Sequence, residues 1–353
     1  MKNYTRRKFV KSLGVTAFGA FAFPKLLFGL TNNWLANSRL KPIEGSWFEF
    51  QHHSVIEGTY WNHALVEFTK RQWDYKIKEI ALSGIRYLVL LNTAIGEKSF
   101  YPSNILSKHD FSCHDPLEVV LSAADKYGVK FFISNGFYGE WTNPYFLMQD
   151  KNIQKIRLKA MNEIAQKYAH HESFYGWYYP NEIEIKGHFD NIFINYVNAC
   201  SEEAKRITPQ AKVLIAPYGT RNVAHDELYM KQLEQLEVDF IAYQDEVGVQ
   251  KTNVEELEPI FEKLYSMHSK IAKSQLWADI EIFDFEGEVY KSPLIPAQAE
   301  RIEQQIKAVK NYVEKIFIYQ YIGLLNRNGT YSFAGQPNSS KLHQELKRKQ
   351  LLS

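Results

Sequence analysis

Hydrophobic positions along this chain follow two alternating patterns from about residue 40 onward. Short runs rich in β-branched and aromatic residues predict strands, and longer stretches with an apolar residue every three to four positions predict helices. Helical periodicity occupies residues 64–83, 116–127, 152–169, 190–207, 226–236, 254–273 and 297–313. Gly84 and Gly128 follow the first two of these segments, where a glycine commonly ends a helix. The eight strand candidates are GSWFEF, YLVLLN, KFFISNG, FYGWYYP, KVLIAP, DFIAYQ, QLWADIEIF and KIFIYQY.

Eight strands that alternate with helices predict an α/β fold, a single (β/α)8 TIM barrel over residues 40–353. No linker rich in Gly, Ser or Pro divides this part of the sequence. A doubly wound open sheet has the same alternation, but it commonly carries a Gly-rich nucleotide-binding turn after its first strand. Here the first strand candidate is followed by QHHSVIEGTYWNH, so the barrel is favoured.

The first 35 residues differ from the rest of the chain. TRRKFVK at residues 5–11, followed by an apolar run of small residues, resembles a twin-arginine export signal. Pro24 and Lys25 interrupt the apolar run, which is therefore too short to cross a bilayer of about 30 Å as a clean helix. We expect residues 1–35 to be a twin-arginine-type signal segment, and the protein to be periplasmic or otherwise exported. A chance basic N-terminus and a short membrane anchor are the alternatives.

The composition is that of an ordinary globular protein, with 45% hydrophobic and 23% charged residues. Forty-two basic and 40 acidic residues give a formal charge of +2, which creates no global field for nucleic acid or a membrane surface. We therefore expect a small or neutral partner, no nucleic acid, and no membrane contact beyond the signal segment.

Cysteine content excludes a disulfide framework. Cys113 and Cys200 are the only cysteines and lie far apart in sequence, so they build neither a set of disulfides nor a cysteine metal site. His109 and His114 lie near Cys113, but the aspartates beside them favour a solvated loop over a zinc site. We expect no metal and no cofactor.

Two glutamates follow strongly predicted strands. Catalytic groups of a (β/α)8 barrel lie at the carboxyl ends of its strands, and Glu182 and Glu281 follow the fourth and seventh strand candidates. These strands approach each other across the mouth of a barrel, so the two carboxyl groups are expected to face one substrate. Glu184 has the same parity as Glu182, which we prefer for its Asn-Glu context. Asp279 shares the parity of Glu281 and is predicted to be a buried structural or supporting carboxylate. A salt bridge or a helix cap is the alternative role for either glutamate.

The Asn-Glu pair at residues 181–182 and the glutamate at residue 281 resemble the arrangement in the large retaining glycoside hydrolase clan built on the (β/α)8 barrel. The segments GSWFEF, KIKEIALSGIRYLVLLNT, SFYGWYYPNEIEI and LWADIEIFDF also resemble a bacterial domain-of-unknown-function family of glycoside-hydrolase-like barrels, over most of residues 43–325. The resemblance implies an O-glycosyl hydrolase acting on a poly- or oligosaccharide. It implies Glu182 as acid/base, Glu281 as nucleophile and Asn181 beside a sugar 2-hydroxyl.

The chemistry requires such a pair independently of the resemblance. One carboxylic acid must protonate the leaving oxygen while a carboxylate meets the charge that develops at the anomeric carbon. A separation of about 5 Å implies retention, and a separation of roughly 6.5 to 9.5 Å implies inversion.

Aromatic and amide residues at the strand ends predict a carbohydrate site, because flat apolar faces and polar edges suit sugar rings. Tyr243 and Gln244 are expected to hold or orient the nucleophile, since a hydrogen-bond donor keeps a carboxylate ionised. We expect the aromatic residues open to a ligand to be Tyr138, Trp141, Tyr218, Tyr243 and Tyr321. The full predicted set of substrate-binding residues is Asn181, Asn135, Tyr138, Trp141, Tyr218, Tyr243, Gln244, Gln320 and Tyr321.

Two other functions stay open on this fold. A metal-dependent sugar isomerase or epimerase needs three or four carboxylate and His ligands from several strand ends, and the fifth and eighth strand candidates end without either. A barrel that binds glycans without cleaving them would keep the aromatic residues of a degenerate active site.

Overall fold

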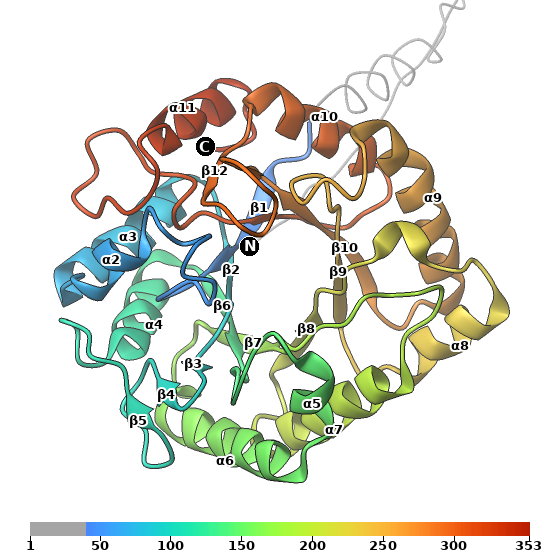
Figure 1. Cartoon of the computed structure of the whole chain (residues 1–353), viewed down its shortest axis with the longest axis horizontal. Coiled ribbons are helices and arrows are strands. Elements are labelled where there is room, and N and C mark those ends of the chain that lie inside the picture. The colour runs from blue at the N-terminus through green and yellow to red at the C-terminus, as the bar shows by residue number, and fades with distance from the viewer. Residues whose placement is uncertain (1–39) are drawn as a thin grey trace, which may run out of the picture. The chain divides into compact units, whose positions relative to one another are not determined.

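Eight parallel strands close into a barrel within residues 40–353, the part of the chain that the computed structural model describes. β1 (Ile43–Phe48) pairs with both β2 (Tyr87–Leu90) and the last barrel strand, β13 (Ile316–Tyr319), which closes the ring. Figure 1 shows the strands as an inner ring and the helices around them. Each predicted strand overlaps one barrel strand, so the predicted barrel is confirmed. Between β2 and β13 the order is β6 (Lys130–Ser134), β7 (Phe174–Tyr178), β8 (Lys212–Ile215), β9 (Phe240–Gln244) and β10 (Gln275–Glu281).

The outer ring of helices follows the predicted periodicity with one interruption. The segment predicted as one helix over 64–83 forms two, α2 (Asn62–Val66) and α3 (Lys70–Leu82). Thr69 begins α3 with a capping box, because its side chain accepts from the Gln72 N–H while the Gln72 side chain accepts from the Thr69 N–H. The other predicted helices form as α4 (Pro116–Tyr127), α6 (Lys151–Tyr168), α7 (Asn191–Ile207), α8 (Glu227–Gln235), α9 (Val254–Ile271) and α10 (Ala299–Val309).

Several short elements were not expected from the sequence. The hairpin of β11 (Phe283–Phe285) and β12 (Leu294–Pro296) follows β10 almost directly, so it begins at the carboxyl end of the barrel. The other unexpected elements are β3 (Ala94–Ile95), β4 (Lys98–Ser99), β5 (Ser107–Lys108), α5 (Pro144–Gln149), η1 (Thr220–Asn222) and α11 (Ser339–Arg348).

The barrel interior is filled by side chains, and aromatic rings dominate it. Trp277 stacks on Phe240 with ring centroids 4.2 Å apart and lies 4.8 Å from the Phe317 ring. Trp47 and Tyr178 belong to the same interior cluster, nearer the carboxyl ends of their strands. A second and larger apolar layer packs between the strands and the helices. These side chains fill the barrel toward the amino ends of its strands and leave space for a cavity at the carboxyl ends.

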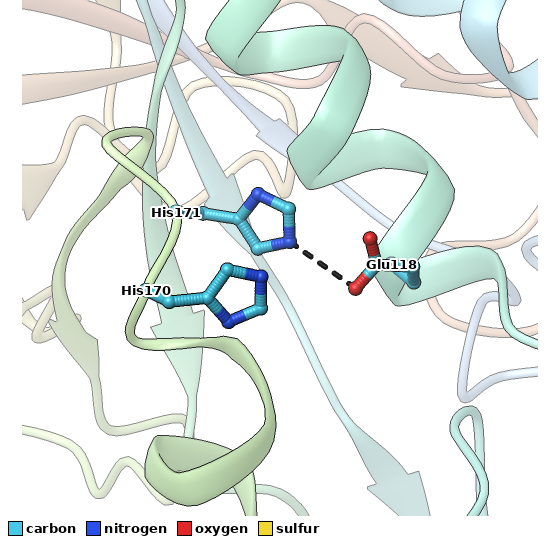
Figure 2. Close-up of side chains that lie close together, drawn as sticks. All are labelled: Glu118, His170 and His171. Atoms are coloured by element: carbon cyan, nitrogen blue, oxygen red, sulfur yellow. Dashed lines mark hydrogen bonds and ion pairs between the residues drawn. The ribbon is translucent and has the colours of Figure 1, made fainter.

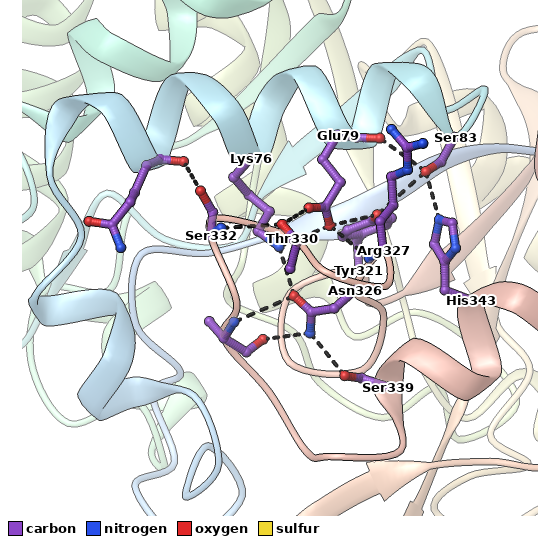
Figure 3. A network of polar contacts seen from close by, with 12 residues as sticks. Lys76, Glu79, Ser83, Tyr321, Asn326, Arg327, Thr330, Ser332, Ser339 and His343 are labelled. Atoms are coloured by element: carbon purple, nitrogen blue, oxygen red, sulfur yellow. Dashed lines mark hydrogen bonds and ion pairs between the residues drawn. The ribbon is translucent and has the colours of Figure 1, made fainter.

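The segment after β13 is attached to α3 by a buried polar network (Figure 3). Lys76 and Glu79 form an ion pair of 3.1 Å whose side chains are almost fully buried. The Lys76 ammonium also donates to the Asn326 side chain at 2.8 Å. Glu79 Oε1 accepts from the Tyr321 hydroxyl at 3.0 Å and from the Arg327 N–H at 3.2 Å. The C-terminal segment is therefore held on the outside of the barrel by bonds that satisfy a buried charge pair.

The predicted export segment lies outside the described residues, so it stays a prediction. Within residues 40–353, none of the helices combines the length and the apolar character needed to span a bilayer.

Candidate active site

A cavity of about 340 Å³ lies at the carboxyl end of the barrel. Its walls come from the ends of β1, β7, β9, β10 and β13 and from the β11–β12 hairpin. Four carboxyl side chains line it, those of Glu57, Glu182, Asp279 and Glu281. The two glutamates predicted from the strand ends therefore share one cavity, as their places on β7 and β10 implied.

Glu182 follows β7 and is held at both carboxylate oxygens. The Tyr178 hydroxyl donates to Oε1 at 2.7 Å, and the Gln244 amide donates to Oε2 at 2.7 Å. Burial raises the pKa of Glu182 to about 8, although both hydrogen bonds act to lower it and the nearby Glu246 adds to the rise. A substantial fraction of this carboxyl group is therefore protonated at neutral pH, which suits a general acid.

Glu281 is the last residue of β10 and is buried, with 4% of its surface exposed. Its Oε2 accepts from the Val249 N–H at 2.8 Å. Burial and the neighbouring Asp245 raise the pKa of Glu281 well above its usual value, while the Val249 N–H and the more distant Arg301 act to lower it. Its backbone is fixed as well, because the Glu281 carbonyl accepts from Arg301 at 3.0 Å and from Gln305 at 3.1 Å.

Asp279 was predicted as a structural or supporting carboxylate, and the structure places it in the cavity wall. It is 2% exposed, and its Oδ1 has no hydrogen-bond partner. Burial, together with Glu281, Asp245 and Glu182, raises the pKa of Asp279 well above its usual value. A buried carboxyl oxygen without a hydrogen bond destabilises the fold unless a ligand hydroxyl or a water molecule bonds to it. Asp279 Oδ1 is therefore available to bond a substrate.

Aromatic rings form much of the remaining wall. Trp47, Tyr178 and Tyr319 come from the ends of barrel strands, and Phe283 and Phe285 come from the β11–β12 hairpin. These rings offer apolar faces beside the carboxyl groups, which is the combination that sugar rings require.

The Tyr319 hydroxyl is oriented by His52. His52 Nδ1 accepts from the Ser54 N–H at 3.1 Å, so Nε2 carries the proton of the neutral ring and donates to Tyr319 at 3.0 Å. Burial holds the pKa of His52 well below its usual value, which keeps the ring neutral. The Tyr319 hydroxyl proton is then free to point into the cavity.

Four of the predicted substrate-binding residues line the cavity, namely Asn181, Trp141, Tyr218 and Gln244. Asn181 donates to the Tyr196 hydroxyl at 3.2 Å, and its Oδ1 has no partner. Gln244 bonds to Glu182, whereas the sequence predicted that it would hold the nucleophile. This part of the prediction is wrong: the amide from β9 orients the proposed acid instead.

Tyr138, Tyr243 and Tyr321 were expected to be open to a ligand, and this expectation is wrong because all three are buried outside the cavity wall. Tyr243 lies on the opposite face of β9 from Gln244, and its hydroxyl contacts His268 Nε2 at 3.1 Å. Tyr321 follows the end of β13 and bonds to Glu79 in the network described above. Tyr138 packs in a satellite apolar cluster beside the barrel.

Asn135 and Gln320 are fully buried and are also absent from the cavity wall. Asn135 donates to the Cys200 sulfur at 3.3 Å and accepts from the Tyr196 hydroxyl at 3.3 Å. Gln320 donates to Glu49 Oε1 at 2.6 Å. Asn135 is connected to the cavity wall through the Tyr196 hydroxyl, which also accepts from Asn181.

Sequence reasoning missed Tyr178, Tyr319 and Asp279 as cavity residues. Asp279 and Glu281 both belong to β10 and differ by two positions, so the alternation of strand faces was a usable signal for Asp279, whereas β7 ends at Tyr178 and alternation does not connect it to Glu182. His53 and Tyr290 also line the cavity, but they lie in loops where no periodicity points inward.

Metal ligands do not gather in this cavity. Within residues 40–353, one group of side chains is spaced to hold a metal ion, and it consists of Glu118, His170 and His171. None of these three residues lines the cavity. The converging ligand set that a metal-dependent sugar isomerase needs is therefore not offered by the cavity residues.

The fold and the site define a (β/α)8 barrel protein with a cavity that is lined by carboxyl groups at the carboxyl ends of its strands. The chain belongs to the family described as "Domain of unknown function (DUF4434)", whose model matches residues 43–330. No curated protein matches the sequence.

Solved structures similar to this chain confirm the fold class. A Bacteroides thetaiotaomicron protein with the provisional name alpha-L-fucosidase is 17% identical, with a TM-score of 0.69 over 97% of this chain and 99% of that one. The endo-1,4-beta-mannanase of Rhizomucor miehei is 9% identical, with a TM-score of 0.54 over 88% and 95% of the two chains. A beta-galactosidase of Halorubrum lacusprofundi is 9% identical, with a TM-score of 0.56 over 87% of this chain and 58% of its own. At these identities the likeness concerns the fold alone.

Proposed function

We propose that this protein hydrolyses a glycosidic bond of an oligo- or polysaccharide by a retaining mechanism. The observation that carries the proposal is the placement of Glu182 and Glu281 in one aromatic-walled cavity at the carboxyl ends of β7 and β10. In this proposal Glu182 is the general acid and base, and Glu281 is the nucleophile.

In the first step the Glu182 carboxyl gives its proton to the glycosidic oxygen, while a Glu281 oxygen forms a bond to the anomeric carbon and the bond to the leaving group breaks. In the second step a water molecule attacks that carbon, Glu182 takes a proton from the water, and the ester to Glu281 breaks. The burial that raises the pKa of Glu182 keeps it protonated for the first step. The bonds from Tyr178 and Gln244 fix its position for both steps.

The pH dependence follows from the two required protonation states. Glu281 must be ionised, so activity rises as the pH passes its raised pKa. Glu182 must be protonated, so activity falls as the pH passes about 8. The expected profile is a bell with its alkaline limb near pH 8.

The test compares three proteins on a panel of oligosaccharides and aryl glycosides that includes fucosides, mannans and galactosides, the sugars in the names of the similar structures. The proteins are the wild type, Glu182→Gln and the matched control Glu184→Gln. Glu184 lies two residues further along, outside the cavity wall, where it accepts from Asn222 at 3.3 Å. We expect Glu182→Gln to lose about 10²- to 10⁴-fold in kcat/KM and Glu184→Gln to retain it.

A dinitrophenyl glycoside separates acid catalysis from a general loss of structure. This leaving group departs without a proton, so the loss in Glu182→Gln should be much smaller on it than on an oligosaccharide. The anomer formed first, measured by NMR, reports retention. Full hydrolysis of oligosaccharides by Glu182→Gln contradicts the assignment of Glu182 as the acid.

A glycan-binding barrel without catalysis is the second candidate, and one observation favours it. Burial raises the pKa of both Asp279 and Glu281 well above normal, with repulsion from Glu281 adding at Asp279 and repulsion from Asp245 adding at Glu281, so both groups can serve as neutral hydrogen-bond donors to a sugar. Saturable glycan binding by the wild type with no turnover of any member of the panel would favour this function.

A further inference from the structure

A second cluster of polar side chains lies on the outside of the barrel, at the amino end of β7. His170 and His171 belong to the turn between α6 and β7, and Glu118 projects toward them from α4 (Figure 2). The coordinating atoms of these three side chains all lie within 4.8 Å of one another. Because β7 begins here and ends near Glu182, the cluster is at the opposite end of this strand from the cavity.

The buried member, His171, is held in one orientation by an aspartate. Its Nδ1 lies 2.6 Å from Asp125 Oδ2, and the other oxygen of Asp125 accepts from the Ser173 N–H at 2.7 Å. A carboxylate accepts from a ring N–H, so Nδ1 carries the proton and Nε2 presents its lone pair on the other side of the ring. A carboxylate behind a histidine is the arrangement that fixes metal-ligating histidines.

That lone pair faces a second acceptor. His171 Nε2 lies 3.2 Å from Glu118 Oε2, and Ser122 donates to the other oxygen of Glu118 at 3.0 Å. Two acceptors at this separation repel each other unless a positive species lies between them, either a proton or a cation. Ligand bonds of about 2.0 to 2.1 Å around a tetrahedral zinc ion place neighbouring ligand atoms about 3.3 to 3.4 Å apart, close to the observed separation.

We propose that Glu118, His170 and His171 bind one divalent transition-metal ion, with zinc as the preferred ion and water completing the coordination. Two imidazoles and one carboxylate form a ligand set typical of zinc and unsuited to magnesium or calcium. Asp125 acts as the positioning residue for His171. The ion joins α4 to the turn before β7, so its role is to stabilise this side of the barrel, away from the cavity.

The test measures metal binding and is independent of any hydrolase activity. Tag-free, EDTA-treated full-length protein is titrated with Zn²⁺ by calorimetry near pH 7.5, with Mg²⁺ as the comparison ion. We expect one zinc per chain and a rise in Tm on zinc addition. Mg²⁺ should give neither effect.

The variants identify the site. His170 is exposed, so His170→Ala removes a ligand without disturbing the core, and the affinity should fall by at least about tenfold. Asp125→Asn should weaken zinc binding by about 10- to 100-fold through the orientation of His171. His188→Ala is the matched control, because His188 also contacts a carboxylate, that of Asp226 at 3.0 Å, in a different part of the surface.

Wild-type affinity in His188→Ala, together with the loss in His170→Ala, supports the proposal. Absence of saturable zinc binding by the wild type would mean that a proton alone occupies the space between His171 and Glu118, and the proposal would be overturned. Equal zinc affinity of the wild type and His170→Ala would overturn it as well, because the ion would then bind elsewhere.

Discussion

The burial that suits Glu182 for acid chemistry should also cost the protein stability at alkaline pH. Folding raises the pKa of this carboxyl group from its usual 4.5 to about 8. Between these two pH values the folded protein retains a proton that the unfolded chain releases. The contribution of Glu182 to stability is therefore full below about pH 4.5 and is lost as the pH rises through about 8.

The size of this effect follows from the two pKa values. At about 1.36 kcal/mol per pH unit, the interval from 4.5 to about 8 corresponds to an upper value of about 5 kcal/mol in the free energy of unfolding. Replacing Glu182 by glutamine removes the titration while preserving the shape of the side chain. The glutamine oxygen can accept from Gln244, and its amide can donate to the Tyr178 oxygen, so both partners stay satisfied.

The assay is guanidinium chloride unfolding of the wild type and Glu182→Gln from about pH 5 to about pH 9. We expect the stability of the variant relative to the wild type to increase steadily with pH, approaching the upper value above pH 8. Glu184→Gln, which removes a carboxylate outside the cavity, should follow the wild type. Parallel stability curves for the wild type and Glu182→Gln would refute the argument, because the carboxyl group would then titrate alike in the folded and unfolded states.

Two further perturbations test the cavity and the outer network. Tyr178→Phe removes a hydrogen-bond donor that favours the charged form of Glu182, so the pKa of Glu182 should rise. A hydrogen bond to a charged group contributes about 1.5 to 3 kcal/mol, so the pH at which activity falls on the alkaline side should increase by about one to two units. If activity fell at the same alkaline pH in Tyr178→Phe and in the wild type, the ionisation of Glu182 would not be the cause of that fall. Lys76→Met leaves the Glu79 carboxylate buried without its cation, and guanidinium unfolding should show a loss of about 3 to 5 kcal/mol that the double variant Lys76→Met/Glu79→Gln partly restores. A single variant as stable as the wild type would contradict the assignment of the pair as a structural element.

The barrel could be predicted from sequence because its signals are local and repeated. Each strand is a short apolar run, and the expected glycines end two of the helices: Gly128 adopts a left-handed φ of 68° after α4, and Gly84 one of 88° after α3. The strand ends then identify which residues approach the mouth. Glu182, Glu281, Asn181 and Gln244 were found in this way, since a strand end is a position that the sequence itself marks.

The errors arose where the direction of a side chain had to be known. Tyr243 and Gln244 were both assigned to the site, although neighbouring residues on a strand point to opposite faces, and the structure directs Tyr243 toward His268. Tyr321 has the parity of Tyr319, but β13 ends at Tyr319, so parity no longer applies beyond it. The contact between Tyr321 and Glu79 joins positions far apart in sequence, which no local pattern reports.

The surroundings of the carboxyl groups distinguish a structural from a functional role. Glu79 is buried and is neutralised by Lys76, as expected of a carboxylate that stabilises the fold. Glu182, Asp279 and Glu281 are placed in a cavity wall, and among the described residues none of them forms an ion pair with a lysine or an arginine. Burying acidic groups together without a cation raises their pKa values and costs stability. Acidic groups gathered in an aromatic-walled cavity with raised pKa values are common at catalytic sites, so this pattern supports the catalytic role proposed for Glu182 and Glu281.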